Sequence, residues 1–137
     1  MNKIATGGSA PALRGGAMSM LTLLACGLAA GCSFHARDAE SYRQDTRTLL
    51  ETRNSDIKSC YDVELQRDPK ATGTVVVKFT VQKETGRIVE PKVDEVASSA
   101  PTTLGQCVVR AIDGLALEPP DERNGDATFR WQFQLKG

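Results

Sequence analysis

The clearest strand signal in this chain lies in residues 73–82, which read Gly-Thr-Val-Val-Val-Lys-Phe-Thr-Val-Gln. Every second residue from Val75 to Val81 is valine or phenylalanine, and the residues of the opposite, solvated face are Thr74, Val76, Lys78 and Thr80. A period of two with many β-branched side chains predicts a strand that is buried on one face.

A second strand is expected over residues 88–96, directly after the turn Glu84-Thr85-Gly86-Arg87. Gly86 can adopt the positive φ that such a turn requires. Pro91 lies inside the second strand, and proline cannot donate a hydrogen bond to a ladder. We therefore expect this strand at an edge of the sheet.

Helices are predicted on both sides of these strands. Residues 41–66 have helical spacing of apolar residues, either as one helix or as two, because Asn54 or Ser55 could cap a fresh helix. A second helical segment begins near Thr102 or Thr103, either of which can cap it. Its amphipathic stripe is Leu104, Cys107, Val108, Ala111, Ile112 and Leu115.

The last strand is expected over residues 127–135, with its aromatic side chains on one face. This face could bind a ligand, but a position beneath two amphipathic helices favours a role in the core. The apolar face comprises Phe129, Trp131, Phe133 and Leu135, and the polar face comprises Thr128, Arg130, Gln132 and Gln134.

This element order predicts an α+β fold, with a three-stranded, mainly antiparallel sheet and two helices packed on one face. A strand–helix–strand connection favours the sheet order 2-1-3. The last strand is then a long exposed edge, which we expect to be the partner-binding surface through its polar face. Arg130 is its visible protection against unwanted pairing.

Cys60 and Cys107 lie on the apolar faces of the two predicted helices. Two cysteines in an exported domain indicate a disulfide, and two buried free thiols are an alternative. A metal site is disfavoured because His35 is the chain's one histidine and two thiolates do not complete a tetrahedral site.

The N-terminal region carries the pattern of a lipoprotein signal peptide. Lys3 and Arg14 precede an apolar stretch of about 14 residues, which ends in Leu28-Ala29-Ala30-Gly31-Cys32. We expect cleavage after residue 31 and acylation of Cys32, including by palmitate. The alternatives are ordinary secretion, lipidation at Cys26, and a retained helix, although a bilayer span needs roughly 20 residues.

The mature chain would have about 106 residues, which suffices for one small domain. It would carry 15 basic and 17 acidic residues, a formal charge of −2, so a nucleic-acid partner is not expected. An enzyme is not expected either, because His35 lies in the predicted tether and both domain cysteines are expected to pair. No phosphate loop or metal-binding spacing is present, and we expect no cofactor.

An ordered set of motifs over residues 55–135 resembles the AgmX/PglI C-terminal domain of myxobacterial proteins, a relative of the TonB C-terminal domain. The motifs are Ile57-Lys58-Ser59-Cys60-Tyr61, Gly73-Thr74-Val75-Val76-Val77-Lys78-Phe79, Thr85-Gly86-Arg87-Ile88, Gly105-Gln106-Cys107-Val108, Leu117-Glu118-Pro119-Pro120 and Ala127-Thr128-Phe129-Arg130-Trp131-Gln132-Phe133. The resemblance implies a TonB-like periplasmic domain that takes a protein partner onto a sheet edge, often within a motility or energy-transducing machine.

The expected organisation is a signal peptide at 1–31, a lipidated tether at 32–40 and a TonB-like domain at 41–137. A lipid anchor and a tether under about 30 Å argue against force transduction across a periplasm. Ser33, which is not aspartate, favours the periplasmic face of the outer membrane. We expect a non-enzymatic lipoprotein that binds an envelope protein, with self-association through the last strand as the alternative.

Overall fold

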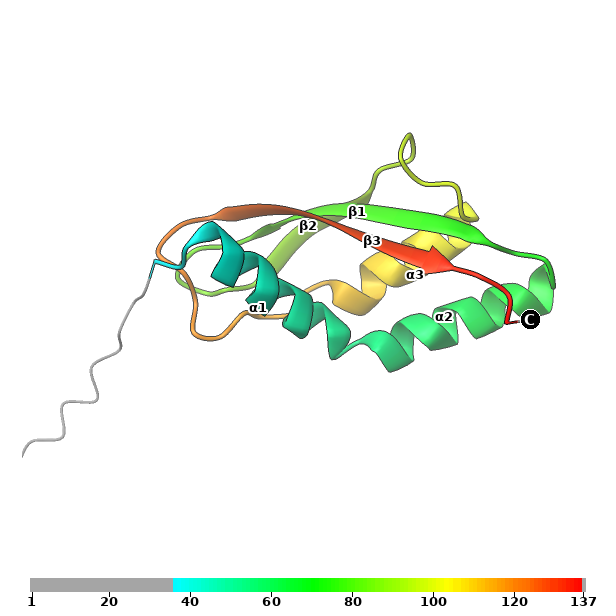
Figure 1. The fold of residues 1–137 in the computed structure, drawn as a ribbon, viewed down its shortest axis with the longest axis horizontal. Coiled ribbons are helices and arrows are strands. Elements are labelled where there is room, and N and C mark those ends of the chain that lie inside the picture. The colour runs from blue at the N-terminus through cyan, green and yellow to red at the C-terminus, as the bar shows by residue number, and fades with distance from the viewer. Residues whose placement is uncertain (1–35, 137) are drawn as a thin grey trace, which may run out of the picture. The chain divides into compact units, whose positions relative to one another are not determined.

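The computed structural model describes residues 36–136, which form three helices and a three-stranded sheet (Figure 1). In chain order the elements are α1 (Ala39–Glu51), α2 (Asn54–Arg67), β1 (Gly73–Val81), β2 (Ile88–Val93), α3 (Thr102–Ile112) and β3 (Gly125–Phe133). The sheet order is β2-β1-β3, and β1 is antiparallel to both neighbours. The predicted fold class and sheet order are confirmed. The signal segment, Cys26, Cys32, Ser33 and His35 lie outside the described residues.

Strand β1 is the centre of the sheet, and its two pairings differ in regularity. It pairs with β3 without interruption over nine positions, whereas its pairing with β2 has an irregularity between Lys78 and Thr80. β2 ends at Val93, three residues before the predicted end. The Asp94 carboxylate accepts hydrogen bonds from the backbone N–H groups of Val96 and Ala97, which turns the chain away from the sheet.

The three helices lie on one side of the sheet (Figure 1). Asp38 caps α1 by accepting hydrogen bonds from the N–H groups of Glu40 and Ser41, each at 3.0 Å. The fold therefore begins before the predicted boundary at residue 41. A break at residues 52–53 separates α1 from α2, so the two-helix alternative for residues 41–66 is the observed one.

The side-chain caps predicted for the other two helices are wrong. Neither α2 nor α3 has a side-chain N-cap hydrogen bond, and the residues at their N-cap positions are Arg53 and Pro101. Thr103 instead donates its hydroxyl to the buried Glu64 carboxylate at 2.5 Å. This bond joins α3 to α2, so the threonine links two helices rather than beginning one.

The core lies between the inner face of β1 and the helices. Its fully buried side chains include Val75, Val77, Leu104, Val108 and Ile112. Val76 was expected on the solvated face but is also buried, at 2% exposure. The loop after β2 accounts for the burial of this stretch, because the Ser98 hydroxyl binds both backbone groups of Val76.

A disulfide joins Cys60 of α2 to Cys107 of α3, with the two Cα atoms 5.8 Å apart. The pairing predicted from the sequence is present, and the two cysteines are 47 residues apart in the chain. The bond therefore connects the helix that precedes the sheet to the helix that crosses beneath it.

We expect reduction of this disulfide to lower the free energy of unfolding by about 2–4 kcal/mol, because the closed loop restricts the unfolded chain. Urea unfolding with and without a phosphine reductant measures the difference. The Cys60→Ser/Cys107→Ser double variant is the control, and its midpoint should not respond to the reductant. Equal midpoints for oxidised and reduced wild-type protein would contradict the expectation.

Candidate functional site

The sheet has two outer edges, and the segment after α3 occupies the beginning of the β2 edge. The N–H of Ile88 donates to the carbonyl of Leu115 at 2.7 Å, and the N–H of Gly114 donates to the carbonyl of Ile88 at 3.2 Å. The N–H of Leu117 donates to the carbonyl of Gly86 at 2.8 Å. Both backbone groups of Ile88 are therefore already paired.

The remainder of the β2 edge has an irregular backbone. Glu90 has a φ of 52°, which is uncommon for a residue other than glycine, and Pro91 has no N–H to donate. An added strand could not follow a continuous ladder past these residues. The prediction that the strand with Pro91 lies at an edge of the sheet is confirmed, since β2 is an edge strand. Its backbone is closed to regular pairing with a further strand.

Nothing within residues 36–136 obstructs the β3 edge in this way. In β1, the backbone groups of Thr74 and Val76 bind the loop on the β2 side. Alternate residues of a strand direct their backbone groups to opposite sides, so the odd-numbered positions of β1 bond to β3. In the observed register, the backbone groups of Thr128, Arg130 and Gln132 consequently point away from the sheet. Within residues 36–136, no backbone hydrogen bond outside the ladder engages them.

Three of the four residues predicted for the binding edge lie on this open side. Thr128, Arg130 and Gln132 belong to β3, and their side chains are exposed. Gln134 lies beyond the end of the strand, and Leu135 is 48% exposed rather than facing the core. Phe133 pairs with Gly73, the first residue of β1, so the residues after Phe133 have no partner in β1.

The aromatic face of β3 is only partly covered. Phe133 is buried, whereas Phe129 and Trp131 remain half-buried against the core, so their assignment as core residues holds in part. Their ring centroids are 4.6 Å apart, and the guanidinium of Arg47 lies 5.7 Å from the centre of the Phe129 ring. The open edge therefore combines free backbone groups with accessible aromatic surface.

A groove of about 530 Å³ separates α1 from the first half of β3. This volume is within the range of small-ligand sites in proteins. Its lining includes Tyr42, Thr46 and Arg47 of α1 and Ala127, Thr128 and Phe129 of β3.

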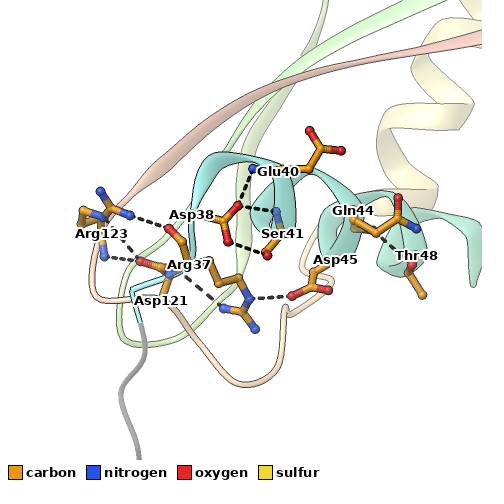
Figure 2. Close-up of polar contacts among 9 residues, drawn as sticks. All are labelled: Arg37, Asp38, Glu40, Ser41, Gln44, Asp45, Thr48, Asp121 and Arg123. Carbon is orange, nitrogen blue, oxygen red and sulfur yellow. Dashed lines mark hydrogen bonds and ion pairs between the residues drawn. The ribbon is translucent and has the colours of Figure 1, made fainter.

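A buried carboxylate in the lining of this groove holds the beginning of α1. Figure 2 shows its polar contacts. Asp121, which is 1% exposed, accepts hydrogen bonds from the backbone N–H groups of Arg37 at 2.8 Å and Arg123 at 3.0 Å. The Arg123 side chain donates to the carbonyl of Arg37 at 2.6 Å, and the Arg37 side chain binds Asp45 at 2.6 Å. α1 is thus attached by a polar cluster as well as by its apolar face.

Tyr42 of α1 contacts the beginning of β3 directly. Its ring lies against Gly125, where a Cβ atom would be 2.2 Å from the tyrosine hydroxyl. Any larger residue at this position would displace the ring. The glycine therefore sets how closely α1 approaches the start of β3.

The charges around this cluster shift two pKa values. Burial raises the pKa of Asp121, but the two backbone hydrogen bonds and the charges of Arg123 and Arg37 outweigh it, so the pKa lies below its ordinary value of 3.8. Burial, followed by the nearby charge of Asp121, raises the pKa of Tyr42. At neutral pH, Asp121 is therefore an anion and Tyr42 a neutral hydroxyl.

Residues 36–136 contain no group of three or more histidine, cysteine, aspartate or glutamate side chains that could hold a metal ion. In the same part of the chain, no helix has the length and apolar character needed to cross a membrane. Cys32, the predicted lipidation site, lies outside this region.

Arg37 and Asp121 were not found from the sequence. Arg37 falls within the predicted tether, and Asp121 lies between the predicted second helical segment and the predicted last strand, yet both are buried and bonded to each other. They are 84 residues apart, so no periodic pattern connects them. The one local signal was the capping pattern from Asp38 to Ser41, which marks the residue just before it as the entry to a helix.

No protein-family model matches the chain, and no curated protein matches it. Among solved structures, the chain is similar to the NMR structure of the TonB C-terminal domain of Helicobacter pylori, with a TM-score of 0.55 and 19% sequence identity. The match covers 76% of this chain and 90% of that one. The fold is therefore TonB C-terminal-domain-like, whereas the narrower AgmX/PglI resemblance stays a prediction.

We expect Asp121→Asn to lower the free energy of unfolding by about 1–3 kcal/mol at neutral pH. The carboxylate now accepts a hydrogen bond from a backbone N–H through each oxygen, and in the variant an amide NH₂ would face one of these N–H groups. Because folding lowers the pKa of Asp121, its contribution is fully present above pH 3.8 and is lost as the pH falls through the pKa of the folded state. Urea unfolding of both proteins at neutral and acid pH measures it.

The exposed neighbour Glu122 provides the matched control, and Glu122→Gln should leave the unfolding midpoint nearly unchanged. A stability difference between wild type and Asp121→Asn that stays constant into the acid range would show that the ionised carboxylate is not the cause.

Proposed function

We propose that this chain is a non-enzymatic lipoprotein of the bacterial cell envelope, whose TonB-like domain binds an extended segment of another envelope protein. The observation that carries the proposal is the edge of β3, whose outward backbone groups have no partner within residues 36–136, while the other edge is partly occupied and otherwise irregular. Adding a strand to such an edge is a general mode of peptide recognition.

The side chains along β3 would select the added segment. Main-chain hydrogen bonds provide affinity in strand addition, and pockets for alternate side chains provide specificity. Thr128, Arg130 and Gln132 lie on the outer face of this edge, and Phe129 and Trp131 lie on the inner face. An apolar residue of the partner would bury the exposed aromatic surface, and Arg130 would disfavour a segment with a positive charge opposite it.

The proposed anchor at Cys32 would keep the domain close to its membrane. Arg37 is already part of the folded domain, and it follows Cys32 by five residues, which span at most about 17 Å when extended. This reach favours recognition at one membrane surface over force transduction across the periplasm. We place that surface at the outer membrane because of Ser33, and the AgmX/PglI resemblance favours a motility or transport machine.

We expect Cys32→Ser to abolish incorporation of labelled palmitate and to release the chain from the membrane fraction. The reason is that the thiol of Cys32 is the proposed acylation site. Cys26→Ser is the matched control and should change neither result. Palmitate labelling that survives Cys32→Ser but not Cys26→Ser would assign the lipid to the other cysteine.

We expect a photoreactive residue at Thr128 or Gln132 to crosslink an envelope protein in cells, because both positions flank the open backbone groups. The same residue at Lys92 is the control, since Lys92 is exposed on the closed β2 edge. An adduct of twice the chain's mass would favour self-association instead. Equal yields from all three positions, or no adduct from β3, would contradict binding at this edge.

A further inference from the structure

The exposed side chains of β3 are arranged symmetrically in charge about Thr128. Asp126 lies two residues before it and Arg130 two residues after it, and all three are exposed on the outer face of the sheet. Within residues 36–136, neither Asp126 nor Arg130 forms an ion pair. The open strand therefore carries one negative and one positive charge at equal distances from its middle.

A second copy of β3, placed antiparallel with Thr128 on a two-fold axis, brings these charges together. Asp126 of each copy then lies opposite Arg130 of the other, and opposite charges across a ladder stabilise it. These positions direct their backbone groups away from β1, so they can form hydrogen-bonded pairs with the second copy.

The inner face of the strand fits the same register. Phe129 of one copy lies opposite Ala127 of the other, and Trp131 lies opposite Gly125. Phe129 and Trp131 are half-buried in the single copy. Small residues opposite the two rings leave room for the rings to be covered, so both faces of the strand favour pairing about Thr128.

Neighbouring registers lack this fit. An axis at Asp126 or at Arg130 would place two like charges directly opposite each other, which destabilises a ladder. An axis one residue to either side of Thr128 would place Arg130 opposite Asn124 or Thr128, which are uncharged. Arg130 therefore favours one register of self-pairing and disfavours the one in which it would face itself.

The same two-fold axis suits two chains anchored in one membrane. It stands perpendicular to the joined sheet, so the helices of both copies lie on the same side (Figure 1). Arg37, which follows the proposed anchor by five residues, leads into α1 on that side. Both anchors can therefore enter one membrane surface.

The contact is a weak one, and it needs the membrane. One strand from each copy buries less than the roughly 1,200 Å² of a stable interface, so the dissolved chain is expected to stay monomeric at micromolar concentration. Confinement of both copies to a surface raises their effective concentration without any new contact.

We propose that two anchored copies of this chain pair through β3 about Thr128, and that this pairing covers the open edge until a partner segment displaces it. The inference rests on the membrane anchor of the proposed function. One edge accepts one added strand, so a second copy and an envelope protein exclude each other. The second copy thereby regulates access to the binding edge.

The test measures the distance between two copies of the full lipidated chain in vesicles of phosphatidylethanolamine and phosphatidylglycerol. A nitroxide label at Gln132→Cys lies on the exposed outer face, and the native Cys60 and Cys107 are already bonded to each other. Double electron–electron resonance should give a separation of about 27 Å between the labelled backbones, because each lies four residues from the axis. Axes shifted by one residue would give about 20 or 34 Å.

Exchange of charges tests the register and keeps the edge intact. Asp126→Arg and Arg130→Asp each place like charges opposite each other, so we expect at least about fourfold less of the dimer signal in each. The double variant, and an equal mixture of the two single variants, restore opposite charges and should restore the signal. The double variant also controls for the lost hydrogen bond from Thr80 to Asp126.

Urea unfolding of each variant checks that the domain stays folded. The absence of the predicted distance in the parent chain would overturn self-pairing. A signal that the single variants leave unchanged, or that the double variant does not restore, would overturn it as well.

Self-pairing and the proposed function fail in different ways. Chains that do not float with the vesicles would overturn the anchor, and self-pairing with it. Anchored chains that lack the signal but still crosslink an envelope protein from β3 would overturn self-pairing alone. In cells, an adduct of twice the chain's mass beside an adduct with an envelope protein is the pattern expected of one edge that serves both.

Discussion

Among the residues that the structure describes, strand β3 is hydrogen-bonded on one side, to β1, and not on the other, and this asymmetry constrains the rest of the molecule. The nine paired positions fix which backbone groups are used internally and which remain available. The other edge is closed by the bonds of Ile88 to the segment after α3 and by the irregular backbone at Glu90 and Pro91. A sheet with one closed edge and one open edge can accept an added strand in a single place.

The surroundings of that open edge depend on where α1 lies. Asp121 binds the backbone of Arg37 immediately before the helix, and Gly125 allows Tyr42 to approach β3. These contacts place the arginine and threonine side chains of α1 opposite the first half of the strand. The same few contacts thus position the helix and form the groove between it and the strand.

The sequence predicted the parts of the fold that follow from the local spacing of apolar residues. The alternation in residues 73–82, the apolar stripe of α3 and the paired cysteines were sufficient for the sheet order and the disulfide. The misplaced details depend on contacts that are distant in sequence. Gln134 falls outside β3 because β1 begins at Gly73, and Asp121 is buried because of a residue 84 positions away. The groove could not be predicted for the same reason.

Amide hydrogen exchange along β3 in the isolated chain tests the central claim most directly. If one side of the strand is free, the amides of Thr128, Arg130 and Gln132 exchange rapidly, and those of Phe129 and Trp131 are protected by β1. This alternation is the result that the account predicts. Protection of both sets of amides would show that the edge is already occupied, and it would contradict the account.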